Sequence, residues 1–539
     1  MRPQTLLSIT LLGSACWAAP VLAKTVVITP YIEVDQSIYA PLKGGGEVLA
    51  STTLAAGVDA SVTGSRTQAQ LAYRVERNIG WKKGSPRNLT HSGLARVNYN
   101  ITPQSLSFEA GAIATRTRTD IRGNALTNNQ ANVENLSQLY SVYAGPSLHT
   151  VAGQLNVNAA YRVGYTKVDS TTSSPLVVGQ PVLNTFDHSV TQQLSASVGM
   201  KSGVLPFGWT ASGAWARDDA SQLDQRLDQK HIRGDVVVPL TPTVAAVGGV
   251  GYEKITASQR DAVSTIDPVT LLPVPTLVNG QYQTVPGSPR LPYYDFSGLY
   301  WDAGVLWRPT NHTSLEARVG RRFGSWSYTG SFSSALSETT AVRVGVYDEI
   351  DTFGSQLNNG LAALPTSFTA VQNPFSGQYG GCVYGGQGGG AGGCLSGALQ
   401  STSSSVYRAR GVTGIITSRR GPWGYGVAAG YARRSYLTPN TGPLATLNGV
   451  SDQSAFIQAY LSRKLTPTSE FDTNLYANWF KSGILGAPTV TSYGASGTYS
   501  RSFGNHLSGA ASLGIFGADE VGIQDALSAS ALLGMRYSF

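Results

Sequence analysis

The feature that most constrains the fold is a strict two-residue alternation of side chains that recurs along the chain. Between Leu155 and Thr166, apolar or aromatic residues occupy every second position, and polar or small residues lie between them. The pattern returns near 69–76, 95–101, 315–322 and 342–347. Alternation over about ten residues predicts strands with one apolar face and cannot form the apolar stripe of a helix. Strands of this length fit a tilted membrane crossing better than a soluble β-sandwich.

Composition narrows the class further. Charged residues make up 13% of the 539-residue chain, against about 25% in a typical soluble domain. The net charge of +8 comes from basic residues dispersed singly along the sequence rather than gathered in patches. This dispersion argues against nucleic acid as a partner. The polar strand faces are therefore unusually poor in charge for a soluble β protein.

The N-terminus reads as an export signal. Arg2 is followed by a short apolar run over residues 6–12, and Val-Leu-Ala at 21–23 fits a cleavage site. We expect residues 1–23 to be a cleaved signal peptide and residues 24–539 to form the mature protein. The apolar run is far below the length of about 18 residues that a membrane-spanning helix needs.

Connectors between the predicted strands alternate between short and long. The short ones lie at 62–65, 102–104, 241–243, 308–312, 465–469 and 505–507, and the long ones at 120–134, 170–188, 257–292, 351–403 and 437–450. Tight turns at one end and longer loops at the other are typical of outer-membrane barrels. We predict an all-β fold, a closed antiparallel transmembrane β-barrel of about 22 strands (range 18–24), with both termini in the periplasm. Closure is required because lipid cannot satisfy an open sheet edge.

The last strand carries an alternating apolar pattern that ends on an aromatic residue. Its apolar positions are Leu533, Met535, Tyr537 and Phe539. This resembles the C-terminal assembly signal of bacterial outer-membrane proteins, which implies the barrel assembly machinery as a partner. The expected location is therefore the cell outer membrane, with outer-membrane lipid around the barrel.

Three segments carry a family resemblance. They are Trp-Arg-Pro-Thr at 307–310, Thr-Ser-Leu-Glu-Ala-Arg-Val-Gly-Arg-Arg-Phe-Gly at 313–324, and Arg-Arg-Gly-Pro-Trp at 419–423. The chain resembles barrel porins associated with exopolysaccharide and PEP-CTERM export systems. The resemblance implies a channel or export-associated barrel with polysaccharide-export components as partners. It transfers no catalytic residue.

The mature chain keeps two cysteines, and both lie in the longest connector. Cys382 and Cys394 would pair as a disulfide in an oxidising compartment. The stapled segment within 351–403 could be a constriction in the barrel mouth, a partner-facing surface or a structural loop. The six histidines are scattered, so we expect no metal site and no cofactor. No Gly-x-Ser-x-Gly motif is present, and we expect no enzyme activity and no catalytic residue.

Arginines recur on the polar face of the predicted strands. Since a charge facing lipid at mid-depth costs about 2–4 kcal/mol, this face should line the lumen. The lumen-lining candidates are Arg74, Arg96, Arg162, Glu316, Arg318, Arg322, Arg343, Arg408 and Arg410. Excess arginine would favour anions. The alternative is that each arginine pairs with a neighbouring carboxylate, such as Glu76 or Glu316, and only stiffens the wall.

These features predict a channel or porin, for passive or export-associated diffusion of small or anionic solutes, saccharides included. A non-conducting structural or surface-interaction barrel that acts through its extracellular loops is the alternative, and a barrel hydrolase is a second one. Barrels of about 16–18 strands leave an aqueous channel, whereas 22-stranded transporters carry a plugged lumen. Here either the lumen is open, or the 351–403 segment and inward side chains fill it.

Overall fold

The computed structural model describes residues 25–82, 88–123, 135–169, 186–203, 205–266, 268, 273–278, 281–386, 390–441, 444–521 and 525–539. The predicted signal peptide, residues 1–23, lies outside the described residues.

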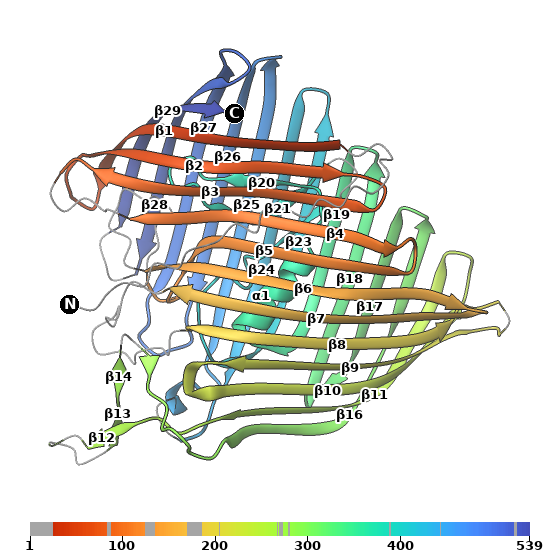
Figure 1. The fold of residues 1–539 in the computed structure, drawn as a ribbon. Coiled ribbons are helices and arrows are strands. Elements are labelled where there is room, and N and C mark those ends of the chain that lie inside the picture. The colour runs from red at the N-terminus through yellow and green to blue at the C-terminus, as the bar shows by residue number, and fades with distance from the viewer. Residues whose placement is uncertain are drawn as a thin grey trace.

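The chain forms a 22-stranded sheet in which successive strands pair antiparallel (Figure 1). The last strand pairs with the first, from Tyr31↔Ser538 to Lys43↔Leu527, so the sheet closes on itself. The predicted all-β barrel of 22 strands is thereby confirmed. The barrel strands are β1 (Thr25–Lys43), β2 (Leu49–Thr63), β3 (Thr67–Gly80), β4 (Leu89–Thr102), β5 (Leu106–Arg118), β6 (Leu136–Ala152), β7 (Leu155–Asp169), β8 (His188–Met200), β9 (Gly208–Ala220), β10 (Gln225–Pro239), β11 (Val244–Gln259), β16 (Leu291–Thr310), β17 (Thr313–Arg322), β18 (Ser325–Ser337), β19 (Thr340–Asp351), β23 (Val406–Arg420), β24 (Trp423–Leu437), β25 (Ser451–Thr466), β26 (Ser469–Lys481), β27 (Thr489–Ser502), β28 (Leu507–Glu520) and β29 (Ala526–Ser538).

The two ends of the barrel differ in their connectors. At one end, here called the turn end, strands join through short segments such as 311–312, 338–339 and 421–422. The opposite end, the loop end, carries the connectors 119–135, 170–187, 260–290 and 352–405. Small elements lie in the loop-end connectors: η1 (Gln222–Asp224), β12 (Ser264–Ile266), β13 (Pro273–Pro275), β14 (Leu277–Val278), β15 (Gln281–Tyr282) and η2 (Ala445–Leu447).

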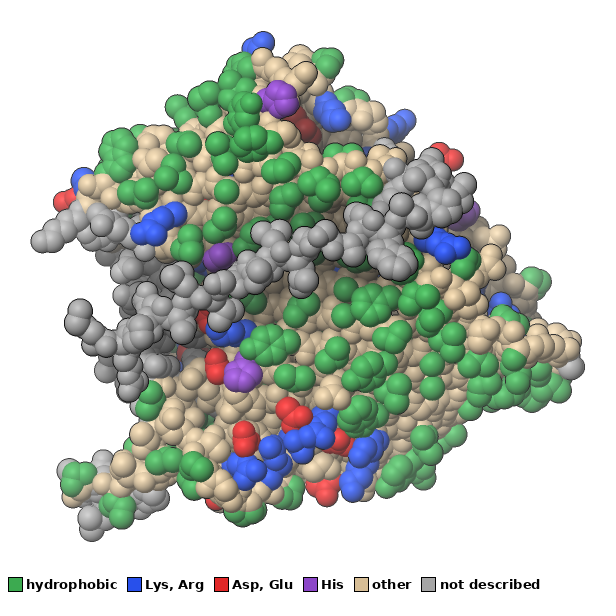
Figure 2. All heavy atoms as spheres, in the orientation of Figure 1, with side chains coloured by type: hydrophobic (Ala, Val, Ile, Leu, Met, Phe, Trp, Pro, Cys, Tyr) green, Lys and Arg blue, Asp and Glu red, His purple; other side chains and the backbone are tan. Residues whose placement is uncertain are grey.

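The outer face of the barrel is apolar. Ile232, Leu299 and Leu533 project outward and are 67%, 77% and 67% exposed, and hydrophobic side chains cover much of the face seen in Figure 2. Aromatic pairs occur near both ends, with Trp301 against Trp326 and Tyr537 against Phe539. A closed sheet with an apolar band and aromatic residues at its borders has the features of transmembrane β-barrels of the bacterial outer membrane.

Among the described residues, no helix has the length and hydropathy needed to cross a membrane.

The long connector between β19 and β23 folds into the barrel rather than away from it. We call residues 352–405 the lumen loop. It contains α1 (Phe353–Ala362), β20 (Phe368–Gln372), β21 (Tyr379–Gly385) and β22 (Gly392–Cys394). Helix α1 contacts β5, β6, β7 and β8, and β21 contacts β23, so the loop lies inside the ring of strands in Figure 1. The lumen is therefore occupied in part by the chain itself.

Local sequence explains how α1 begins and which face it buries. The Thr352 side chain accepts a hydrogen bond from the Ser355 backbone at 3.2 Å and caps the helix. Phe353, Leu357 and Leu361 recur every four residues and are fully buried. They join one apolar cluster with inward-facing residues of the wall, including Leu94, Ile113, Leu139, Tyr143 and Val168. This packing fixes the lumen loop against β4–β7.

The sheet is folded inward beside β19. The β18–β19 ladder runs from Gly330↔Val346 to Ser337↔Thr340, toward the turn end, and does not include residues 325–329 of β18. Nearer the loop end, Gln229 of β10 donates a 2.7 Å hydrogen bond to the Ile350 carbonyl of β19. Leu227, Ile255, Ala257, Ile350 and Val406 form a buried cluster there. The outer face of β19 and β23 thus packs against the inner face of β10 and β11. We call the part of the barrel bounded by β10, β11 and β16–β18 the β10–β18 sector. This packing closes the sector at the loop end.

Candidate functional site in the barrel lumen

Two cavities flank the lumen loop. The turn-end cavity has a volume of about 900 Å³ and lies between residues 369–377 of the loop and the inner faces of β1, β3 and β25–β29. The loop-end cavity has about 140 Å³ and lies between residues 373–381 and 396–400 of the loop and the walls β5, β25, β26 and β27. Both are therefore bounded by the loop and share the wall formed by β25, β26 and β27.

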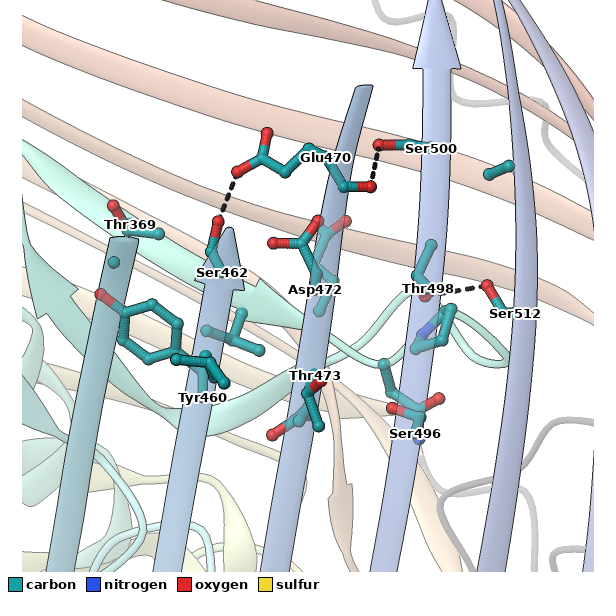
Figure 3. A pocket seen from close by; sticks show the side chains of 18 of the residues that line it. Thr369, Tyr460, Ser462, Glu470, Asp472, Thr473, Ser496, Thr498, Ser500 and Ser512 are labelled. Carbon is teal, nitrogen blue, oxygen red and sulfur yellow. Dashed lines mark hydrogen bonds between the residues drawn. The ribbon is translucent and has the colours of Figure 1, made fainter. Parts of the chain in front are cut away.

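The wall of the turn-end cavity is rich in hydroxyl groups (Figure 3). Ser496, Thr498 and Ser500 project from β27 toward it, and Thr498 hydrogen bonds Ser512 of β28 at 2.8 Å. Neighbouring β26 adds Glu470, which accepts from Ser462, and Asp472, which is exposed to the cavity. Inward side chains of these strands are mostly small, so space remains beside the loop.

Formal charges lining this cavity balance. The acidic residues are Glu33, Asp35, Glu470 and Asp472, and the basic residues are Arg74, Arg419, Lys464 and Arg536. Four of each sign give the lining no excess charge. The predicted surplus of positive charge is therefore absent from this cavity's lining.

Arg74 shows how an inward arginine is neutralised. Its guanidinium pairs with Glu33 at 2.7 Å, Asp35 at 3.0 Å and Glu76 at 3.0 Å. The Arg74 side chain is only 9% exposed. Three carboxylates from β1 and β3 thus hold one arginine, and the pairing with Glu76 is the alternative that the sequence left open.

Four more of the predicted arginines face the lumen and also have acceptors there. Their partners are Glu109 for Arg162 (2.8 Å), Asp235, Asp302 and Glu316 for Arg318 (2.7, 2.9 and 2.5 Å), Glu253 for Arg322 (2.9 Å), and the Ala363 carbonyl for Arg343 (3.3 Å). The Arg318 network also includes Arg233, and it borders a separate cavity of about 200 Å³ in the β10–β18 sector.

Arg408 and Arg410 require a correction. We predicted that they line the lumen, but the inward residues of β23 are their neighbours Tyr407 and Ala409, which are fully buried. The Tyr407 hydroxyl donates to Gln356 of α1 at 3.0 Å. Arg408 and Arg410 lie on the opposite face and pair with Asp348 of β19 at 2.7 and 3.3 Å. The apolar residues of β23 here face the lumen loop instead of lipid, which reverses the expected orientation.

Two arginines hold the backbone of the lumen loop. Arg96 of β4 donates to the carbonyls of Ala362 and Leu364, both at 3.1 Å, at the end of α1. Arg434 of β24 is 1% exposed and donates to Gly397 and Ala398 at 2.7 Å and to Ser401 at 3.2 Å. Carbonyls that would otherwise be buried without donors are satisfied in this way. Arg434 was not among the predicted residues.

An amide on α1 adds a polar anchor in the apolar interface. Asn358 is 1% exposed and reaches Thr191 at 3.0 Å and Ser141 at 3.0 Å. A Cβ atom at Gly164 of β7 would collide with the Asn358 amide, so the glycine makes room for the loop.

The cysteines lie where the loop doubles back. Cys382 of β21 and Cys394 of β22 are register partners and are joined by a disulfide. Cys382 packs with Tyr384 against Ile415, Ala428 and Tyr460 of the wall. Burial raises the pKa values of Tyr379 and Tyr384, both on this part of the loop, well above the ordinary value for tyrosine. The stapled segment is thus in the lumen, between β23–β25 on one flank and β4–β7 on the other.

The burial of the lumen loop was not predicted, although the sequence carries a signal for it. Residues 352–407 contain no Asp, Glu, Lys, Arg or His. A solvated loop of this length normally carries charge, whereas a segment buried inside a barrel cannot do so without partners. Absence of charge, together with the apolar period of α1, could have indicated burial.

The C-terminal residues lie on the strand that closes the barrel. Leu533, Met535 and Tyr537 project outward from β29 with Phe539 just beyond it, and the Phe539 amide donates to the Pro30 carbonyl of β1 at 3.0 Å. Recognition of these residues by barrel assembly machinery stays a prediction. No group of three His, Cys, Asp or Glu side chains that could hold a metal occurs among the described residues.

Comparisons with known proteins find only distant similarities to solved structures. No family model and no curated protein matches it. Similar structures include the ferric-catecholate import receptor Fiu of E. coli K12 (10% identity, TM-score 0.46, covering 94% of this chain and 81% of that one) and the FrpB iron transporter of Neisseria meningitidis (9%, 0.44, 95% and 81%). A loop-deletion mutant of OmpT, an outer membrane protein of Vibrio cholerae, also matches (9%, 0.30, 96% and 100%). At these identities and TM-scores the likeness says nothing about solute or partner. The resemblance to exopolysaccharide-associated porins stays a prediction.

Proposed function

We propose that this protein is a passive channel of the bacterial outer membrane for small polar solutes, with the lumen loop as its filter. The observation that carries the proposal is the cavity of about 900 Å³, with many hydroxyl-bearing residues in its lining, inside a closed barrel whose outer face is apolar. Hydroxyl groups in the wall of such a cavity can form hydrogen bonds with water and with polar solutes that enter the barrel. In this proposal the barrel transports solutes and catalyses no reaction. Its turn end faces the periplasm.

Charge pairing shapes the expected selectivity. The lining of the turn-end cavity carries equal numbers of acidic and basic residues, and Arg74 is held by three carboxylates. We therefore propose weak charge selectivity in place of the anion preference expected from the sequence. Diffusion of saccharides linked to an export system rests on the family resemblance alone.

A second candidate is a non-conducting barrel that acts through its surface. The apolar packing of α1 on β4–β7 favours it, because a firmly docked loop can close a lumen. The two candidates differ in whether folded protein makes a membrane permeable.

Liposome swelling tests the proposal. Protein reconstituted in liposomes should let glycerol in rapidly and sucrose slowly, because the lumen loop occupies part of the barrel and a larger solute passes a narrowed lumen more slowly. Liposomes with heat-denatured protein serve as the control. Glycerol-driven swelling that is no faster with folded barrel than in the control liposomes would contradict the channel and favour the non-conducting candidate.

A further inference from the structure

The two cavities beside the lumen loop share residues. Asn373 of the loop and Asn474 of β26 line both the turn-end and the loop-end cavity. From this point one cavity extends toward Lys464 and Ser500 at the turn end, and the other toward Ser454 and Phe480 at the loop end. The shared residues therefore lie between the two cavities.

Other sectors of the lumen are closed by packing. Helix α1 is sealed onto β4–β7 by the apolar cluster that contains Leu357. Tyr384 and Cys382 pack on β23–β25. The β10–β18 sector is closed at the loop end by the cluster around Ile255 and Ile350. Along β26–β29, by contrast, Phe375 of the loop packs against Phe516, Leu532 and Tyr476. Leu532 lines the turn-end cavity and Tyr476 lines the loop-end cavity, so both cavities border this contact.

Polar atoms along this line lack partners. The buried Asn474 Oδ1, Gln378 Nε2 and Tyr460 Oη atoms form no hydrogen bond with any described residue. Each buried polar group left unsatisfied costs about 1–3 kcal/mol. These three atoms have almost no accessible surface, so a solute pairs with them only where it displaces the side chains that cover them. An amide oxygen accepts, an amide NH₂ donates and a phenol does both. A hydroxyl group complements all three.

We propose that solutes cross the barrel between the tip of the lumen loop and β26, and that Asn373 and Asn474 form the constriction that favours uncharged, hydroxyl-bearing solutes. This inference rests on the proposed channel function and deepens it. Asn373 is partly committed to the loop, because its Oδ1 accepts from the Phe375 backbone at 2.9 Å and its backbone carbonyl accepts from Gly377 at 2.8 Å. Asn474 belongs to the rigid wall and is the better position for substitution.

Charge placed at Asn474 tests the route. In planar bilayers under a KCl gradient, Asn474→Asp should shift the reversal potential toward cation preference and Asn474→Lys toward anion preference, because a charge acts most strongly at a narrow point. The matched controls are Ser331→Asp and Ser331→Lys. Ser331 of β18 is exposed on the inner face, as the register partner of Glu316, but lies in the β10–β18 sector. These controls should leave the reversal potential near the wild-type value.

A neutral substitution tests the solute class. Asn474→Leu keeps the size of the side chain but removes its hydrogen-bonding groups, and it should lower glycerol-driven swelling at least about threefold. Ser331→Leu should have no such effect. Every variant is first checked for folding by its gel mobility with and without boiling.

The outcomes distinguish failure of the proposed constriction from failure of the proposed channel. If wild-type protein conducts while Asn474 variants behave like Ser331 variants, the proposed constriction is wrong and the channel stands. If both positions shift the reversal potential equally, the route along β26 is wrong. Folded wild-type protein that neither conducts KCl nor admits glycerol would overturn the channel itself.

Discussion

Arg74 lies among Glu33, Asp35 and Glu76 on the inner faces of β1 and β3, close to the seam where the barrel closes. Each of these carboxylates is largely buried, and Asp35 is 2% exposed. A cluster of this kind is stable only while the cation is present, because the carboxylates then have a shared partner.

Removing that cation should be costly. Arg74→Met removes the cation that Glu33, Asp35 and Glu76 share, and we expect a loss of about 3–5 kcal/mol in the free energy of unfolding. Urea unfolding of protein in lipid vesicles, followed by tryptophan fluorescence, measures the change. Lys82→Met is the control, since Lys82 pairs with Glu47 where both side chains are exposed, and it should leave the urea midpoint unchanged. Equal midpoints for the two variants would contradict a structural role for Arg74.

Sequence reading succeeded at residues where one strand face meets lipid and failed where both faces meet protein. Leu155 to Thr166 alternates because lipid and lumen impose opposite demands on successive residues. Tyr407 and Ala409 are apolar because they face the lumen loop, so the assumption that apolar residues face lipid misplaced Arg408 and Arg410. The two-residue alternation shows that the two faces of a strand differ in polarity, but it does not show which face points into the barrel.

At the scale of elements, the lumen loop is held by several independent devices. The apolar stripe of α1 packs on β4–β7, Arg96 and Arg434 bind loop carbonyls, and the disulfide staples β21 to β22. The strands and the alternation of connectors could be predicted because each follows from local periodicity. The docking of the loop could not, because it depends on contacts between residues far apart in sequence, such as Arg96 with Leu364.

The disulfide should limit the mobility of the lumen loop, whereas the position of the loop in the lumen should not depend on it. Replacing both Cys382 and Cys394 by Ser removes about 3 kcal/mol of stabilisation from the stapled segment, by the chain-entropy estimate for a loop with a sequence separation of 12. Since α1 and the two arginines remain, we expect noisier single-channel currents at a mean conductance close to that of the wild type. Dithiothreitol should give the same noise in the wild-type protein and no change in the double variant. A quiet double variant would show that the disulfide does not restrain the loop.

At the scale of the molecule, the protein is a wide barrel that is narrowed by its own connector. Twenty-two strands enclose more space than inward side chains can fill, and the loop occupies much of it along β4–β8 and β23–β25. Two cavities remain beside the loop, and Asn474 lines both. Closure of the sheet by β1 and β29 is independent of the loop, so the barrel and its filter can be separated experimentally.

The most direct test is the conductance of the wild-type barrel beside a variant without the lumen loop. Asp351 and Tyr407 are register partners, so a short Gly-Ser turn in place of residues 354–403 can join β19 to β23 without altering the sheet. In planar bilayers we predict small, discrete steps for the wild-type protein and steps several-fold larger for the deletion variant, because the loop restricts the lumen. Equal conductance in the two folded proteins, or a silent wild type, would contradict a channel filtered by its own loop.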